Sequence, residues 1–251
     1  MKIYLRKKEN FNPETLDFYE KNFELTEEKD ADVIVINDFE PIETDKIVAC
    51  NSTGIEHIKA KEIISLRGED LKDLTAVPEL CLGMAIYCMR IFKGEEVRGK
   101  TLGLIGYGRI GRKFASMAHE LGMSIIRTDN SDSLDNTWEL EDLLENSDIV
   151  SLHITADEEN RNFIDKAKFE LMKDGAIFLN SARPWLVSEQ DFYWALEHKL
   201  AGAWLDFNMP FAENLVTTPH LGGSTLESKR KSEMILARKL LKLYGNPANK
   251  T

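Results

Sequence analysis

Two polar side chains that follow strand-like segments have the chemistry needed to reduce a 2-oxo acid. Arg183 comes soon after the apolar run AIFLN, and His220 follows the short run LVTTP. Such a reduction needs a cation that holds the carboxylate and polarises the ketone, and an acid that protonates the nascent alkoxide. A guanidinium fork binds a carboxylate through two hydrogen bonds, and imidazole exchanges its proton near neutral pH. Arg183 and His220 are therefore candidate catalytic residues.

A GxGxxG motif spans residues 106–111, between the apolar run TLGLI and the helical pattern RKFASMAHELG. In that setting the motif is typical of a dinucleotide site. Its first glycine permits a tight turn, the second lets the backbone approach a pyrophosphate, and the third allows close packing of helix on sheet. The helix N-terminus would offer N–H groups and a positive dipole to the phosphates. The candidate cofactor residues here are Gly106, Gly108, Arg109, Ile110 and Gly111.

Asp129 ends the next strand-like run, SIIRT, where an acidic side chain can accept hydrogen bonds from the adenosine ribose. This favours NAD over NADP as the cofactor. Arg127 and Arg109 argue for NADP, because a nearby guanidinium can hold a 2′-phosphate. A methyltransferase with a similar glycine loop is a further alternative.

The elements that position these residues alternate between apolar runs and helical or polar stretches, which is typical of α/β proteins. Five runs predict a doubly wound parallel sheet of Rossmann type, covered on both faces: TLGLI, SIIRT, DIVSLHI, GAIFLN and AGAWLD. Shorter runs before residue 51 predict a smaller α/β lobe. Pro78 opens an apolar helix that could link the lobes, and residues 224–244 have helical periodicity and are expected to pack on the first lobe.

Composition narrows the function classes. The formal net charge of −11 disfavours nucleic acid and anionic membranes as partners. No apolar run approaches the roughly 18 residues that cross a bilayer, and no signal peptide is recognisable, so we expect a soluble, cytoplasmic protein. Cys50, Cys81 and Cys88 form no CxxC pair and are expected to be reduced core residues. We expect no metal site.

Six segments resemble, in order, the signatures of the D-2-hydroxyacid dehydrogenase family: NSTGIEHI (51–58), GKTLGLIGYGRIG (99–111), SLHI (151–154), LNSAR (179–183), AGAWLD (201–206) and TPHLGGST (218–225). The similarity covers about residues 30–245, and the last segment is most similar to the phosphoglycerate dehydrogenase branch. The resemblance implies an NAD-binding Rossmann domain over residues 89–222. It also implies a smaller, flavodoxin-like α/β substrate domain over residues 1–88 and 223–251.

The resemblance further implies roles for individual residues. Arg183 falls at the family's catalytic arginine and His220 at its general acid and base. Asp206 falls at the aspartate that hydrogen-bonds the nicotinamide carboxamide, although an aspartate that caps a loop at a strand end is the alternative. The loop expected to receive the substrate carboxylate contains Ser52, Thr53 and Gly54, and the remaining cofactor contacts are His153, Ala182 and Gly222.

The chain departs from the family after Asp206. Family members carry a Glu-Pro pair there, whose glutamate pairs with the histidine, whereas Met209 precedes Pro210 here. Without a carboxylate partner an imidazolium loses its proton more easily, which would shift reduction toward acidic pH. Asn208 and Glu213 are the two candidate substitutes, although neither is in register.

We therefore interpret the chain as an NAD-dependent oxidoreductase that interconverts a small 2-oxo acid and its D-2-hydroxy acid, and the resemblance implies a homodimer. The candidates are glyoxylate or hydroxypyruvate, glycerate, phosphoglycerate and lactate-like acids. An unphosphorylated acid is favoured, because the nearest cation to Gly54 is Lys59. The alternative is an NAD-binding regulator or sensor with impaired catalysis, which the missing glutamate would explain.

Overall fold

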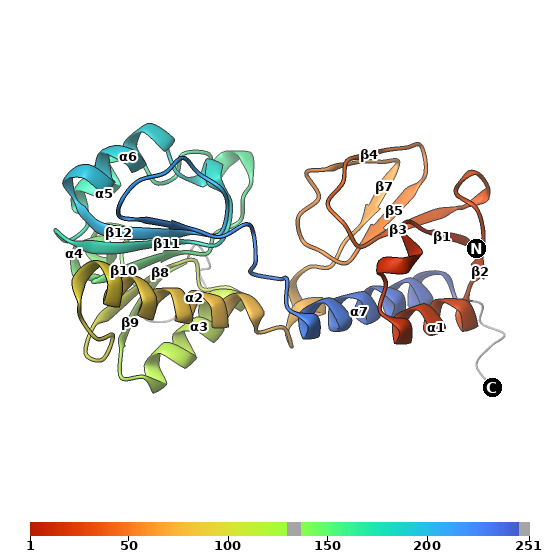
Figure 1. Ribbon diagram of the computed structural model, residues 1–251, viewed down its shortest axis with the longest axis horizontal. Coiled ribbons are helices and arrows are strands. Elements are labelled where there is room, and N and C mark those ends of the chain that lie inside the picture. Colours follow the sequence, from red (N-terminus) through yellow and green to blue (C-terminus); the bar gives the residue numbers. More distant parts are fainter. Residues whose placement is uncertain (130–136, 246–251) are drawn as a thin grey trace. The chain divides into compact units, whose positions relative to one another are not determined.

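The computed structural model describes residues 1–129 and 137–245, drawn in colour in Figure 1. By internal contacts the chain divides into two units, Met1–Leu74 with Thr225–Thr251, and Thr75–Ser224. The sequence placed the first boundary at residue 88. The boundary lies earlier because the intervening helix, α2 (Ala76–Cys88), buries Cys81, Ala85 and Cys88 in the core of the second unit.

The first unit is built on a five-stranded parallel sheet with the order β2-β1-β3-β5-β7. Strands β4 and β6 pair with each other in a separate two-stranded sheet. If the five strands of the main sheet are numbered by their order along the chain, their order in the sheet is 2-1-3-4-5, the flavodoxin-like order predicted from the resemblance. Its strands are β1 (Lys2–Leu5), β2 (Glu24–Leu25), β3 (Val33–Ile36), β4 (Ile42–Glu43), β5 (Ile47–Cys50), β6 (Ile58–Lys59) and β7 (Glu62–Ile64), and its helices are α1 (Pro13–Asn22) and α7 (Leu226–Tyr244).

The two faces of this sheet are covered differently. Both α1 and α7 pack on one face, where Tyr19, Leu236 and Leu240 are wholly or almost wholly buried. The other face is covered by the segments around β4 and β6, which contribute Ile42 and Ile58. The tail helix therefore lies in the first unit, as its periodicity predicted.

The second unit carries a six-stranded parallel sheet with the order β13-β12-β11-β10-β8-β9. Its strands are β8 (Thr101–Ile105), β9 (Ser124–Thr128), β10 (Ile149–Leu152), β11 (Ala176–Asn180), β12 (Leu200–Leu205) and β13 (Leu215–Thr217). Besides α2, its helices are α3 (Arg109–Glu120), α4 (Leu140–Asn146), α5 (Lys166–Leu171) and α6 (Glu189–His198), and a π-helical turn at Met89–Lys93 continues α2. The five predicted runs all form strands of this sheet.

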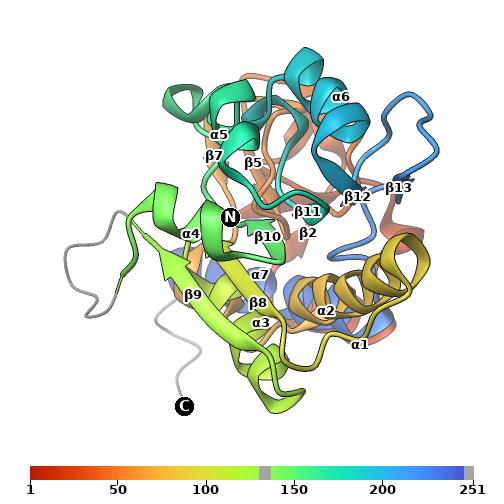
Figure 2. The ribbon, with the colours of Figure 1, turned by 90° about the vertical axis from the view of Figure 1, so that its left-hand side faces the viewer.

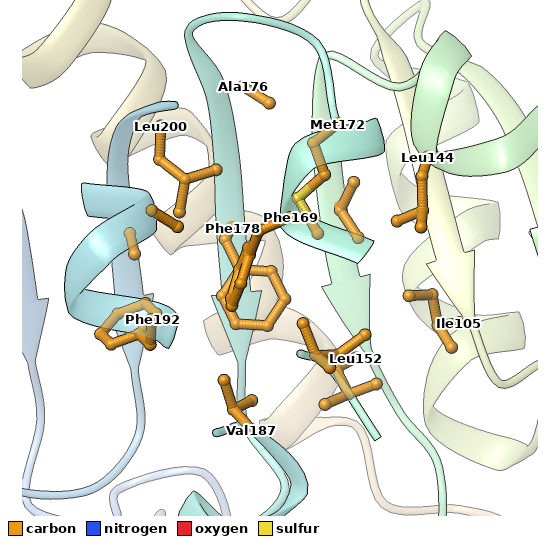
Figure 3. Packing of buried hydrophobic residues seen from close by; sticks show 14 of the residues in the cluster. Ile105, Leu144, Leu152, Phe169, Met172, Ala176, Phe178, Val187, Phe192 and Leu200 are labelled. Atoms are coloured by element: carbon orange, nitrogen blue, oxygen red, sulfur yellow. The ribbon is translucent and has the colours of Figure 1, made fainter. Parts of the chain in front are cut away.

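Helices cover both faces of the second sheet, which confirms the doubly wound prediction. Figure 2 shows α5 and α6 on one side and α2 and α3 on the other. On the α5–α6 side, Phe169, Phe178 and Phe192 pack against one another, with the Phe169 and Phe178 ring centroids 5.5 Å apart (Figure 3). Burying three aromatic rings in one layer contributes several kcal/mol, at about 2 kcal/mol per side chain.

Within the described residues, none of the helices has the length and apolar character required to span a bilayer. The three cysteines are buried, as predicted.

Candidate active site

The predicted residues of the second unit gather at one edge of its sheet. Each follows the carboxyl end of a strand: the glycine loop follows β8, Asp129 follows β9 and His153 follows β10. Ala182 and Arg183 follow β11, Asp206 follows β12 and His220 follows β13. Because all six strands are parallel, these segments share the edge where open α/β sheets bind ligands.

The glycine loop has the geometry of a phosphate cradle. Gly106 has a φ of 95°, and a methyl group there would lie 2.6 Å from the His153 carbonyl oxygen. A methyl group at Gly111 would overlap the Gly106 carbonyl oxygen, whereas nothing lies within 4 Å of one at Gly108. Gly108 is the N-cap residue of α3 and, as a glycine, offers no side-chain hydrogen bond to the first N–H groups of this helix. The loop thus fits a pyrophosphate beside Gly108.

Asp129 and the glycine loop are joined directly. The Tyr107 backbone N–H donates to Oδ2 of Asp129 over 2.6 Å. The Arg127 guanidinium lies over the Tyr107 ring, 3.9 Å from its centroid, and the Arg112 guanidinium lies 5.8 Å from it. The acidic residue predicted to meet the ribose therefore stands beside the loop predicted to meet the pyrophosphate.

His153 lies beneath the glycine loop. Its Nε2 atom is 2.9 Å from the Ser151 hydroxyl, and its ring contacts Phe114 edge-on. Its Nδ1 atom is buried and has no hydrogen-bond partner among the described residues. Burial lowers the pKa of His153 to about 4, so the imidazole is neutral at physiological pH. His153 thus supports the loop from inside, and its contact with the cofactor stays a prediction.

This buried histidine is expected to make the second unit sensitive to acid. Its pKa is about 4 in the folded state against 6.5 in the unfolded chain, so the unfolded state binds more protons between these values. Stability is fully present above pH 6.5 and falls as the pH drops toward 4, by about 3 kcal/mol. Urea unfolding followed by tryptophan fluorescence, to which the buried Trp204 contributes, should show this loss in the wild type and not in His153→Gln. Parallel pH curves for the two proteins would contradict the assignment.

The loop that carries Arg183 is held by Asn180, a buried residue at the end of β11. The Asn180 side-chain N–H donates to the Arg183 carbonyl oxygen over 3.0 Å, and its Oδ1 accepts from the Ala182 N–H over 2.8 Å. The Arg183 guanidinium in turn donates to the Ala182 carbonyl oxygen over 2.9 Å. Residues 180–183 thus form a fixed turn.

The loop that carries His220 is held by the buried carboxylate of Asp206. That carboxylate accepts hydrogen bonds of 2.7 Å from the Thr218 hydroxyl, the Leu221 N–H and the Gly222 N–H. A methyl group at Gly222 would lie 2.9 Å from Oδ2, so only glycine fits there without a shift. Asp206 therefore has the loop-capping contacts that the sequence kept as the alternative. A carboxylate has about four acceptor sites, so one more donor can be accommodated.

His220 itself has an unusual backbone conformation. Its φ is 55°, in the left-handed region, and its N–H donates to the Thr218 carbonyl oxygen over 2.8 Å. Its Nδ1 atom lies 3.1 Å from the Asp206 carbonyl oxygen. A carbonyl only accepts, so Nδ1 carries a hydrogen and Nε2 is left to exchange a proton. Asn208 and Glu213, the two candidate substitutes for the missing glutamate, both have exposed side chains.

Ser52, Thr53 and Gly54 belong to the other unit, in the loop after β5. The Ser52 hydroxyl donates to the Gly54 carbonyl oxygen over 2.9 Å, which closes a tight turn. These residues lie at the carboxyl edge of their own sheet, as Arg183 and His220 do in theirs.

Sequence reasoning missed the residues that support the site. Asn180 holds the arginine loop, and the Trp204 indole N–H donates over 3.0 Å to Thr218, which bonds Asp206 in turn. A signal for Asn180 was present, because it is a polar residue at the end of an otherwise apolar buried strand.

Comparison with known proteins agrees with this geometry. The profile described as "D-isomer specific 2-hydroxyacid dehydrogenase, NAD binding domain" matches residues 87–222. A hydroxypyruvate reductase of Thermotoga maritima is 30% identical over 86% of this chain and 86% of its own length. The chain belongs to the D-isomer-specific 2-hydroxyacid dehydrogenase family. It is accordingly an NAD-dependent oxidoreductase of D-2-hydroxy acids, and none of these findings favours a binding-only regulator.

Other relatives of this dehydrogenase family differ in length. A D-3-phosphoglycerate dehydrogenase of Methanocaldococcus jannaschii is 30% identical over 86% of this chain, which spans 50% of that protein. Among solved structures, the NAD⁺-bound 3-phosphoglycerate dehydrogenase of Entamoeba histolytica has a TM-score of 0.80 at 20% identity, over 100% of this chain and 96% of that one. D-lactate dehydrogenase of Escherichia coli has a TM-score of 0.78 at 21% identity, over 97% and 96%. At such identities the two structures show the shared fold.

Proposed function

We propose that this dehydrogenase reduces a small, unphosphorylated 2-oxo acid with NADH, using Arg183 to bind and polarise the substrate and His220 to transfer the proton. The observation that carries the proposal is the fixed orientation of His220. Its Nδ1–H is engaged by the Asp206 carbonyl, 3.1 Å away, in a loop that the Asp206 carboxylate pins through three hydrogen bonds. A general acid must be held in this way to act at one atom.

We assign a different step of the reaction to each group of residues. Arg183 pairs with the substrate carboxylate and draws electron density from the ketone oxygen. In the first unit, the N–H groups of the loop containing Ser52 and Gly54 keep their predicted role as donors to a carboxylate. NADH, when bound, supplies the hydride that the keto carbon receives. His220 gives its Nε2 proton to the nascent alkoxide, and takes one back in the oxidation direction.

The charges near the expected carboxylate loop support an unphosphorylated substrate. Arg6, at the end of β1, is paired with the Asp38 carboxylate and also donates to the Glu40 carbonyl oxygen over 3.0 Å. Lys59 is exposed and pairs with Glu43. Both cations are already paired with carboxylates, which weakens their attraction for the second anionic group of a phosphorylated acid.

The same proposal includes NAD in preference to NADP. The Asp129 carboxylate lies next to the glycine loop, where a 2′-phosphate would meet a like charge. Arg127 is engaged with the Tyr107 ring. The ratio of kcat/KM for NADH to that for NADPH tests this preference, and a ratio below one would reject it.

We also propose a cytoplasmic homodimer. Helix α2 is apolar around its whole circumference, yet Ile86 and Tyr87 are exposed, as is Ile91 in the following turn. Such a surface is suited to contact with a second copy of the chain. Sedimentation would test this, and a monomer at micromolar concentration would reject it.

Because the cations near the carboxylate loop are already paired, we expect the enzyme to prefer unphosphorylated 2-oxo acids. Glyoxylate, pyruvate and hydroxypyruvate should be reduced with NADH between pH 5 and 8, and 3-phosphohydroxypyruvate should be reduced more slowly. In Arg183→Lys, which keeps the charge but loses the planar fork, kcat/KM should fall by roughly 100-fold. Lys199→Arg, in the same unit but paired with Asp174, is the matched control and should keep full activity. Preferred reduction of the phosphorylated acid would contradict the proposed substrate class.

A further inference from the structure

The C-terminal helix holds the carboxyl edge of the first sheet through two adjacent polar residues. Ser232 and Glu233 are buried in α7, exposed by only 7% and 4%. They precede the core residues Leu236 and Ala237 by one helical turn and therefore face the same way. Buried polar side chains in such a position require partners.

Each of the two residues bonds the residue that directly follows one strand. The Ser232 hydroxyl accepts a hydrogen bond of 3.1 Å from the Asn51 side chain, just after β5. Glu233 accepts 3.2 Å from the Asn37 side chain, just after β3, and 2.9 Å from the Asn12 N–H. Strands β3 and β5 are paired neighbours, so α7 fastens two adjacent strand ends.

Asn51 is the residue that introduces the Ser52–Gly54 turn. The Ser232 hydroxyl also donates to the Lys229 carbonyl oxygen over 3.1 Å, so its hydrogen is committed and its lone pair is directed to Asn51. The start of the turn is thereby fixed by a side chain about 180 residues further along the chain.

We propose that Ser232 is a positioning residue for the substrate carboxylate: through Asn51 it holds the Ser52–Gly54 turn in the form that binds the 2-oxo acid. This inference rests on the proposed role of that turn. Ser232 touches neither substrate nor cofactor, so its loss weakens substrate binding and leaves hydride and proton transfer intact.

Steady-state kinetics of Ser232→Ala test the inference. KM for the 2-oxo acid should rise about tenfold, because the Asn51 donor is left unpaired, while kcat changes less than twofold. The affinity for NADH should not change, and Ser232→Thr should restore KM. Ser228→Ala is the matched control, since Ser228 is a buried serine of the same helix whose hydroxyl makes no hydrogen bond to a strand end within the described part of the chain.

A second variant separates positioning from general damage to the fold. Asn51→Ala removes the donor of the same hydrogen bond, so the double variant Ser232→Ala/Asn51→Ala should raise KM no further than the more severe single variant. Additive effects, an unchanged KM in Ser232→Ala, or an equal rise in Ser228→Ala would each overturn the inference.

Amide hydrogen exchange keeps the inference testable if the proposed function fails. Should the wild type reduce no 2-oxo acid, the proposed function is rejected. Faster exchange at residues 52–54 in Ser232→Ala than in Ser228→Ala would still support the positioning of the turn. Equal exchange in the two variants would overturn it.

Discussion

Replacing His220 by alanine is expected to lower kcat/KM for 2-oxo acid reduction by about 10³-fold, within the range that general acid–base catalysis contributes. The imidazole is oriented by its Nδ1–H on the Asp206 carbonyl, so we assign the proton transfer to Nε2. NADH affinity should not change, because the loss is confined to proton transfer. Steady-state kinetics together with a fluorescence titration of NADH would measure both quantities.

The controls for this prediction come from the same unit. His198→Ala removes an exposed histidine at the end of α6 and should leave kcat/KM unchanged. His220→Gln keeps a donor and a comparable size but cannot exchange a proton, so it should be as inactive as the alanine variant. If His220→Gln retained more than a tenth of the wild-type rate, another group would have to supply the proton.

The strands of the second sheet, and the edge at which the candidate site residues lie, could be predicted from the sequence for a simple reason. Strands buried on both faces of a parallel sheet are continuous apolar runs, and five such runs are visible between residues 101 and 206. The residue type that ends each run then indicates which chemistry lies at the carboxyl edge. Gly106, Asp129 and Asp206 could all be placed at that edge in this way.

The unit to which α2 belongs could not be predicted, because the sequence of this helix does not show which of its faces is buried. An amphipathic helix shows which face is buried, but α2 is apolar on every side. Only the contacts of Cys81 and Ala85 with the second core decide that it belongs there.

The hydrogen bonds that hold the loops of the candidate site could not be predicted either. Thr218 and Asp206 are joined by a hydrogen bond across 12 residues of chain, and Ser232 and Asn51 across 181. Such pairs depend on where loops meet in space, which periodicity does not encode. The departure at Met209 could be read from the sequence, but the backbone carbonyl of Asp206 as the partner of His220 could not.

Gly108→Val is expected to abolish NADH binding while the protein stays folded. A Cβ atom added at this position would have no neighbouring atom within 4 Å, and the φ of −76° suits any residue. Losing a glycine N-cap costs at most about 1 kcal/mol of stability. The added side chain would, however, occupy the space beside the N-terminus of α3 and displace the pyrophosphate from its N–H donors. Two lost hydrogen bonds to a charged group weaken NADH binding by at least about 100-fold.

Two other glycines make this prediction specific to the cradle. Gly111→Val should lose both NADH binding and stability, because its side chain would overlap the Gly106 carbonyl oxygen. Gly83→Val, in the middle of α2, also adds its Cβ atom where no neighbour lies within 4 Å, and this variant should bind NADH normally. Calorimetric titration with thermal unfolding distinguishes the three variants. Wild-type NADH affinity in Gly108→Val would mean that the pyrophosphate does not lie against this loop, and the assignment of the whole cofactor edge would have to be abandoned.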